Sequence, residues 1–208
     1  YTTLFRSYDK TNIGSPMPKF TFGWTNTFRY KNFDLSVFIN GSYGNKVYNY
    51  LSMKLTHMNS PWTNQLNAVN GRAQLVPINP NKVYEDGTMW YNDVSNVMVA
   101  NPGASIPRAT INDPNDNDRI SDRYIEDGSY IRLKNISLGY TFPKKTIDKL
   151  GLSNLRIYAN IQNLLTITGY DGYDPEIGAS TSSVNVYGLD NGRYPSPTVY
   201  SFGLNVSF

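Results

Sequence analysis

Acidic and amide side chains that could bind a cation gather in one stretch of the chain, DPNDNDRISD. Asp113, Asn115 and Asn117 stand at every second position, which is the spacing from which an EF-hand loop offers oxygen ligands to Ca²⁺. The glycine needed at the sixth position of such a loop is absent, and Tyr124 stands where the bidentate glutamate belongs. We therefore favour a solvated turn, keep calcium as the alternative, and expect no cofactor.

The residue types that most enzymes need are nearly missing. The chain has one histidine, His57, and no cysteine, which excludes thiol catalysis, disulfides, cysteine-ligated zinc and the usual triads within this sequence. The adjacent carboxylates Glu126 and Asp127 precede Gly128, a combination typical of a turn before a strand. We expect that the protein is not an enzyme.

Aromatic residues in long polar stretches are the remaining candidates for binding. Flat aromatic faces stack on sugar rings or anchor a partner protein at low entropic cost. The candidates for substrate or partner contact are Trp62, Trp90, Tyr91, Tyr170 and Tyr173, with Tyr187 and Tyr194 in the same kind of stretch. The alternative is that these rings only pack the loops against one another.

The composition excludes several classes of partner. The formal net charge of +3 is too small, and the basic residues too scattered, to indicate nucleic-acid binding. Aromatic residues make up 14% of the chain, yet its mean hydropathy is −0.46. No run approaches the roughly 18 apolar residues of a transmembrane helix, but the strands of a membrane barrel alternate and give no such run.

Five segments alternate between apolar and polar residues, which predicts β-strands. They lie near residues 19–30, 32–43, 129–142, 154–165 and 198–208, each about as long as the roughly 9–11 residues that cross a bilayer at a tilt. Phe38 breaks the second segment, and Ile131 and Leu133 are out of phase with Ile136. A bulge near Asn135, or an upper half outside the membrane, would account for that shift.

The lengths of the connections alternate as well. A tight turn at Lys31 and Asn32 joins the first two strands, and a short helical turn stopped by Gly151 joins the third and fourth. The other connections, 44–123 and 166–197, are long, and short turns opposite long loops are typical of an outer-membrane barrel. The side chains expected to face its lumen include Lys19, Arg29, Asp34, Arg156, Asn160, Gln162 and Asn205. A soluble β-sandwich with one apolar face is the alternative.

Five strands are too few to close a barrel, since single-chain bacterial barrels start at about eight. We therefore expect residues 8–208 to be the C-terminal portion of a larger barrel that is truncated before Tyr8. Residues 1–7, YTTLFRS, match the in-frame translation of a common sequencing adapter and are expected to be an artefact. No signal peptide is recognisable in this sequence.

Several blocks, in order, carry a resemblance to a known family. They include IGSPMPKFTFGWTNTFRYKNFDLSVFINGSYGNKVYN, DRYIEDGSYIRLKNISLGYTFPKK, LRIYANIQNLLTITGYDGYDPEIG and YPSPTVYSFGLNVSF. The chain resembles the C-terminal end of SusC/RagA-type TonB-dependent outer-membrane transporters from Ile13 to Phe208, except for a stretch around Gln65 to Val99.

The resemblance implies an all-β, 22-stranded transmembrane barrel in the outer membrane of a Gram-negative bacterium. It also implies import of oligosaccharides or peptides with a SusD-like lipoprotein, a TonB complex acting through the missing N-terminal part, a lipid bilayer as surroundings, and no nucleic acid. Family members end in an aromatic strand that the barrel-assembly machinery recognises by strand addition. The corresponding residues are Tyr200, Phe202, Leu204, Val206 and Phe208. The alternative function is a soluble or surface carbohydrate-binding β-sandwich module.

Overall fold

A computed structural model describes residues 10–113, 115–176 and 186–208, so the expectation for residues 1–7 lies outside the described part. The chain divides into two compact units. The sheet unit comprises Ile13–Asn49 and Ile125–Phe208, and the loop unit comprises Tyr50–Tyr124 with the described residues up to Asn12. Among the described residues, no helix combines the length and the apolarity needed to span a membrane.

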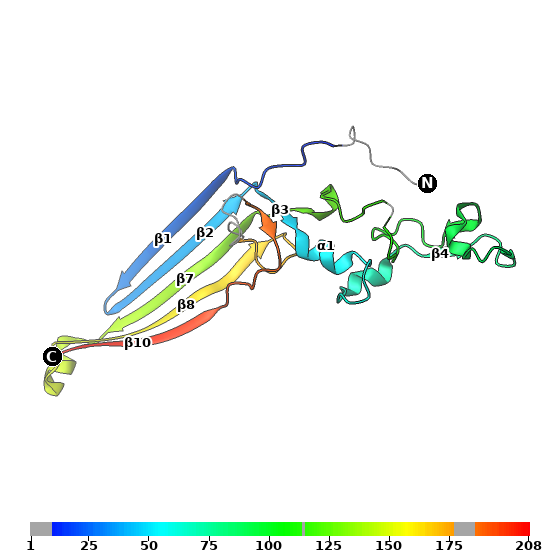
Figure 1. Ribbon diagram of the computed structural model, residues 1–208. Helices are drawn as coiled ribbons and strands as arrows, with labels where there is room; N and C mark the ends of the chain where they lie inside the picture. Colours follow the sequence, from blue (N-terminus) through cyan, green and yellow to red (C-terminus); the bar gives the residue numbers. More distant parts are fainter. Residues whose placement is uncertain (1–9, 114, 177–185) are drawn as a thin grey trace. The chain divides into compact units, whose positions relative to one another are not determined.

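The sheet unit is built on five antiparallel strands in the order β1-β2-β7-β8-β10 (Figure 1). Their bounds are Phe20–Tyr30 for β1, Phe33–Tyr43 for β2, Tyr130–Thr141 for β7, Asn154–Thr168 for β8 and Val199–Ser207 for β10. Each strand starts within one residue of its expected position, while β8 continues to Thr168, past the expected end at residue 165. The expected all-β fold with five long strands is confirmed.

The register places like residues in rows across the sheet. One row is apolar and consists of Phe28, Leu35, Leu138, Ala159 and Phe202. The next row lies on the opposite face and is polar, with Thr27, Ser36, Ser137, Asn160 and Ser201. Because adjacent residues of a strand point to opposite faces, this register gives the sheet one apolar and one polar face.

Two departures from alternation have local explanations. Phe38 lies on the polar face, opposite Thr25, and a Cβ added at Gly23 would lie 3.2 Å from its ring, so Gly23 makes room for it. The register shifts opposite β2, where the neighbouring residues Phe38 and Ile39 pair with Asn135 and Leu133, so that Lys134 is an extra residue of β7. This bulge confirms the one expected near Asn135 and keeps Leu133 on the apolar face.

The two short connections lie at one end of the sheet, with the C-terminus (Figure 1). Lys31 takes the left-handed conformation in the β1–β2 turn, with φ of 53°. Between β7 and β8, helix α2 (Lys144–Ile147) and the 3-10 turn η6 (Asp148–Leu150) end at Gly151, whose φ of 68° is easy only for glycine. The expected helical turn stopped by Gly151 is thus present.

At the opposite end, a small second sheet has the order β6-β3-β9. Strand β3 (Lys46–Asn49) pairs antiparallel with β6 (Ile125–Asp127) and parallel with β9 (Leu189–Asp190). Val47 on β3 is 1% exposed and forms part of the core. The small sheet therefore ties residues 186–190 of the last long connection to the sheet unit.

The loop unit consists of short elements. They are α1 (Tyr50–Thr56), η2 (Asn67–Gly71), β4 (Leu75–Pro77), η3 (Trp90–Asn92), η4 (Val94–Asn96), β5 (Val97–Val99) and η5 (Asp122–Tyr124). Strands β4 and β5 form an antiparallel pair of three residues each. These elements were not expected from the sequence, which indicated only a long connection.

Candidate functional site

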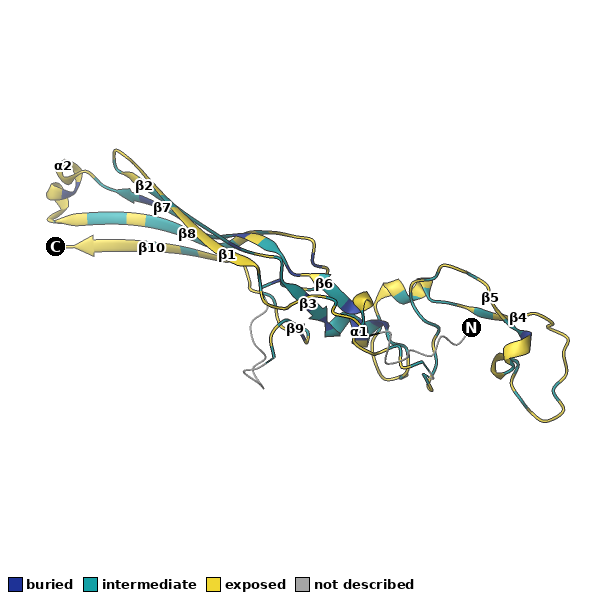
Figure 2. Ribbon diagram, turned by 90° about the horizontal axis from the view of Figure 1, so that it is seen from above, coloured by how far each residue is buried: buried dark blue, intermediate teal, exposed yellow. Residues whose placement is uncertain are grey.

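The apolar face of the five-stranded sheet is exposed to its surroundings. Trp24 is 55% exposed, Phe202 84% and Leu204 60%, and Figure 2 shows β1 and β10 largely in the exposed class. At about 3.3 Å per residue, the interval from Phe20 to Tyr30 covers roughly 33 Å, or roughly 25 Å of height at a tilt of about 40°. That height matches the apolar band of an outer-membrane barrel.

Aromatic rings gather on this face at the short-turn end. The Phe33 and Tyr140 ring centroids lie 4.7 Å apart, and those of Tyr140 and Phe142 lie 5.0 Å apart. At the other end, the centroids of Phe20 and Tyr43 are separated by 5.4 Å. Aromatic residues at both edges of an apolar band are the pattern of interfacial girdles.

On the polar face, an ion pair crosses a strand. The Arg156 guanidinium on β8 donates to both carboxylate oxygens of Asp34 on β2, at 2.6 and 3.2 Å. Strand β7 lies between them, and a Cβ at Gly139 would collide with both side chains. Gly203 on β10 likewise lies under the ring of Tyr158. Glycines on this face thus let long polar side chains lie flat across the sheet.

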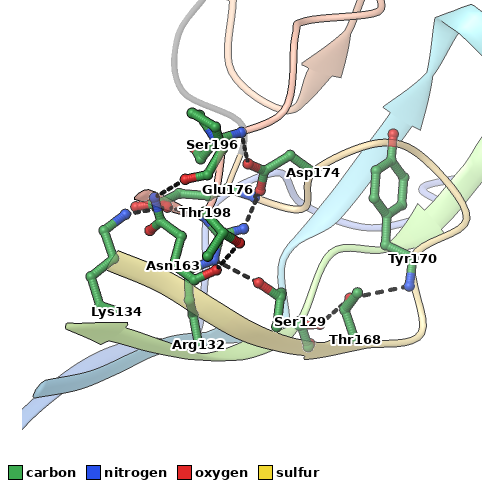
Figure 3. Close-up of polar contacts among 12 residues, drawn as sticks. Ser129, Arg132, Lys134, Asn163, Thr168, Tyr170, Asp174, Glu176, Ser196 and Thr198 are labelled. Carbon is green, nitrogen blue, oxygen red and sulfur yellow. Dashed lines mark hydrogen bonds and ion pairs between the residues drawn. The ribbon is translucent and has the colours of Figure 1, made fainter. Parts of the chain in front are cut away.

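The bulge in β7 carries a second, more deeply buried cluster (Figure 3). The Arg132 side chain is 3% exposed; its Nη1 donates to Glu176 at 2.6 Å, its Nη2 donates to Asp174, and its Nε donates to Thr166 at 2.8 Å. Lys134 donates to the same Glu176 oxygen at 2.6 Å. Residues two apart in a strand point to the same face, so Arg132 and Lys134 reach the same acid from β7.

Asp174 joins two parts of the connection between β8 and β10. Besides Arg132, the backbone N–H groups of Glu176 and Ser196 donate to its carboxylate, each at 2.9 Å. Burial alone would raise the pKa of Asp174, but these hydrogen bonds favour the carboxylate and hold the pKa below its usual value. We call the described parts of this connection, residues 169–176 and 186–198, the strap.

A buried tyrosine fixes the base of the strap. Tyr170 is 5% exposed, and its hydroxyl donates to Asp190 on β9 at 2.5 Å. Burial and the neighbouring Asp190 carboxylate raise the pKa of Tyr170 far above its usual value. The backbone N–H of Asp171 also donates to Glu126, at 3.0 Å. The strap is therefore held to the polar face by Arg132 and to the small sheet by Tyr170.

A cavity of about 600 Å³ opens beside the strap. The polar face contributes Thr21, Ser42 and Tyr130 to its lining, the bulge contributes Lys134, and the strap contributes Glu176, Tyr187, Arg193 and Ser196. This volume lies within the range of small-molecule sites, and the lining mixes aromatic, hydroxyl and charged groups.

The aromatic residues expected to contact substrate or a partner differ in their exposure. Trp62 is 93% and Tyr173 64% exposed, as a contact role requires. Trp90 and Tyr91 lie on η3 with their rings edge to face and centroids 5.7 Å apart. Tyr170, by contrast, is buried as part of the strap, so its ring packs inside the sheet unit and offers no surface for a partner.

Two of the three residues that suggested a calcium loop, Asp113 and Asn117, bind each other. The Asp113 carboxylate accepts from the backbone N–H and the side-chain amide of Asn117, at 2.5 and 2.6 Å, and lies 2.9 Å from His57 Nε2. Burial opposes this charge, but the hydrogen bonds outweigh it and lower the pKa of Asp113. Within the described ranges, no three His, Cys, Asp or Glu side chains gather closely enough to hold a metal ion.

The residues expected to signal barrel assembly share the apolar face of strand β10. Tyr200, Phe202, Leu204 and Val206 are exposed on this edge strand, and Phe208 follows it at 93% exposure. The backbone of Ser207 accepts a hydrogen bond from Ser153 at 2.8 Å, so pairing with the preceding connection holds the end of the strand.

Known proteins are similar to this chain over nearly its whole length. No family model matches the chain. The TonB-dependent receptor P3 of Formosa agariphila is 36% identical over 205 residues, 96% of this chain and 17% of the receptor. The TonB-dependent receptor SusC of Bacteroides thetaiotaomicron is 28% identical over 97% of this chain and 16% of its own length. Over nearly all of its length, the chain is similar to one segment of TonB-dependent receptors.

Solved structures share the fold of this chain. A structure of the RagAB peptide importer in its closed-closed state matches 98% of the chain and 19% of its own chain, with a TM-score of 0.67 and 19% identity. The open-open state gives a TM-score of 0.65. The chain spans less than a fifth of the relatives that it matches. The matches over 96% of the chain also include most of the stretch around Gln65 to Val99 that the resemblance left out.

Sequence reasoning missed the cluster on the polar face of the sheet. The cations Arg132 and Lys134 lie about 40 residues before the acids Asp174 and Glu176, and none of the four belongs to a motif. The shift in alternation predicted the bulge, and charged residues at a predicted bulge were the available signal. Arg193 carried no signal of its own, because only the fold of the strap brings it to the cavity.

Proposed function

We propose that this chain forms part of the barrel wall of a TonB-dependent importer in the outer membrane of a Gram-negative bacterium. One observation carries the proposal: a five-stranded antiparallel sheet has an exposed apolar face and a polar opposite face. In a barrel, the apolar face meets lipid and the polar face lines the lumen, while neighbouring strands satisfy the open edges of β1 and β10.

The importer takes up glycans or peptides together with a SusD-like lipoprotein and draws on a TonB complex. Homology to receptors named SusC and TonB-dependent, and the shared fold with the RagAB peptide importer, support this assignment. In this arrangement 44–123 and 166–197 are extracellular loops. Trp62, Trp90, Tyr91 and Tyr173 would then offer exposed or partly exposed rings to substrate or to the lipoprotein.

The C-terminal strand has a second role in the same proposal. The apolar side chains of β10 form the signal read by the barrel-assembly machinery, since backbone pairing supplies affinity and alternate side chains supply specificity. Its exposed edge next to Phe208 is open to such strand addition.

The alternative of a carbohydrate-binding β-sandwich needs a second sheet over the apolar face. In the part of the chain that the structure describes, Trp24, Phe202 and Leu204 stay exposed. Expression without detergent separates the two functions. A monodisperse, cooperatively folding soluble domain would favour the sandwich, whereas inclusion bodies that refold only with the rest of the receptor favour the barrel.

Site-specific labelling tests the facing directly. Cysteines are placed at Phe202 and at Ser201, one on each face of β10, in a cysteine-free form of the full receptor in outer-membrane vesicles. We expect Phe202→Cys to react with a lipid-soluble maleimide and to resist a charged one, and Ser201→Cys to react with the charged reagent. Equal reaction of both cysteines with the charged reagent contradicts a lipid-facing apolar side.

A further inference from the structure

The cavity beside the strap lies next to two buried contacts. Tyr130 and Lys134 reach it from the sheet, while Glu176, Tyr187 and Arg193 reach it from the strap. Two buried contacts hold the strap: Arg132 binds Asp174 and Glu176, and Tyr170 binds Asp190. A site whose walls are already held in place loses little conformational entropy when a ligand binds.

One cation at the cavity lies outside the ion-pair cluster. Arg132 and Lys134 both donate to Glu176 at 2.6 Å, and Arg132 also pairs with Asp174, so these two cations and two carboxylates balance one another. Arg193 donates its backbone N–H to Asp190 at 3.4 Å, and within the described residues its guanidinium forms no ion pair. Arg193 is thus the cation that remains available, and a guanidinium matches a carboxylate with two parallel hydrogen bonds.

Aromatic and hydroxyl groups complete the lining. Tyr187 is 55% exposed and lines the cavity. The Arg132 guanidinium lies 5.6 Å from the ring centroid of Tyr130, in a cation–π contact. Ser42 and Asn45 both line the cavity. Ser42 Oγ donates to Asn45 Oδ1 at 2.9 Å, which orients the side-chain amide of Asn45. Rings for stacking beside donors and acceptors suit the faces and hydroxyls of a sugar.

We propose that this cavity binds a saccharide unit that carries a carboxylate. Arg193 holds the carboxylate, Tyr187 covers a face of the sugar ring, and Asn45 and Ser42 bind hydroxyl groups. The volume of about 600 Å³ accommodates a small oligosaccharide. This inference rests on the proposed function and narrows its substrate class from glycans or peptides to acidic glycans.

The test compares two ligands that differ only in charge. Binding of an oligogalacturonate and of its carboxyl-reduced, neutral counterpart to the full receptor in detergent is measured by isothermal titration calorimetry. We expect the acidic ligand to bind roughly tenfold tighter, because a charge-assisted bidentate pair is worth at least that ratio. Arg193→Gln should abolish the preference, and Lys149→Gln, which removes an equal charge on η6, should preserve it.

Further variants keep the test decisive. Tyr187→Phe should bind both ligands as the wild type does, and Tyr187→Ala should weaken both, since the ring supplies contact area. If Arg193→Gln fails to fold, the wild type is measured in low and high salt, where only the acidic ligand should lose affinity.

Three results would overturn the inference: equal affinity for the two ligands, an unchanged preference in Arg193→Gln, or preference for an acidic peptide over the oligogalacturonate. A receptor that inserts into the outer membrane yet gives one of these results refutes the cavity proposal alone. A receptor that never inserts refutes the proposed function as well.

Discussion

The two units of the chain are stabilised in different ways. In the sheet unit, backbone ladders run through strands of nine to fifteen residues, and the side chains alternate with the pleat. In the loop unit, polar side chains replace the ladder: Asn96 accepts from the backbone of Asn79 at 2.7 Å and returns a hydrogen bond to its carbonyl at 3.1 Å. An alternating sequence pattern specifies the sheet unit, and individual side-chain contacts specify the loop unit.

The strap combines the two. It belongs to the sheet unit, yet it contains only the two-residue strand β9 and depends on side-chain contacts as the loop unit does. Its ion pairs are more deeply buried than the Lys82–Asp93 pair of the loop unit, since the Arg132 side chain is 3% exposed and the Lys82 side chain is 42% exposed. Buried charges that lose their partners are costly, so the strap should be the most sensitive part of the chain to single substitutions.

The largest effect is expected at Arg132. Arg132→Leu leaves Asp174 and Glu176 without their shared partner, which should cost about 3–5 kcal/mol of local stability. Hydrogen exchange of the full receptor should show residues 169–176 exchanging as fast as an open loop, while the strands keep their protection. Lys134→Leu is the matched control, because its side chain is 31% exposed and surface pairs contribute about 0–1 kcal/mol. Equal exchange in the two variants would show that the buried pair does not hold the strap.

The next effect separates the faces of the sheet. Leu204→Arg or Ile157→Arg places a charge on the apolar face and should cost about 2–4 kcal/mol of barrel stability in bilayers. Asn205→Arg and Asn160→Arg place the charge on the polar face instead. These two substitutions should leave the barrel stability nearly unchanged. Urea unfolding of the receptor in lipid vesicles measures both. Similar losses on the two faces would reverse the facing that the register implies.

A smaller effect is expected in the loop unit. Asn96 is 4% exposed, and Asn96→Ala leaves the backbone N–H and carbonyl of Asn79 and the hydroxyl of Tyr84 without this partner. The loss should be about 1–3 kcal/mol of local stability. Hydrogen exchange should rise around residues 79–97 and stay unchanged in β7 and β8. Asn92→Ala, a substitution in the adjoining 3-10 turn η3, serves as the comparison and should leave that protection close to wild type.

The long strands of the sheet unit could be predicted because apolar and polar residues alternate along them. Every strand was placed within three residues, and Ile131 and Leu133 predicted the bulge because a one-residue slip would have turned them to the polar face. The position of Gly151 predicted the end of the helical turn, since few other residues adopt its backbone conformation.

The strap and the loop unit could not be predicted in the same way. Arg132 and Asp174 meet only because β7 and β8 are paired and the chain then turns back over them. Tyr170 was predicted as a surface contact because a tyrosine in a polar stretch looks the same whether it is exposed or bonded to a buried Asp190. Asp113 and Asn117 fit a calcium pattern, although their side chains hydrogen-bond to each other instead.

Acid should have the smallest effect on local stability, and it should act on the strap and on the loop unit but not on the five-stranded sheet. The folded pKa of Asp174 lies below its usual value, so its contribution to stability is complete above about pH 4 and is lost as the pH falls through the folded pKa. The pKa of Asp113 in the loop unit is also lowered, so both regions should loosen below about pH 4 while the strand ladders persist. Hydrogen exchange at pH 3, corrected for the intrinsic rate, measures this. In Arg132→Leu the strap is already open, so its hydrogen exchange should not rise further in acid. The loop unit of this variant should respond to acid as it does in the wild type. A strap that still loosens with acid in this variant would assign the response to groups other than the Arg132–Asp174 pair.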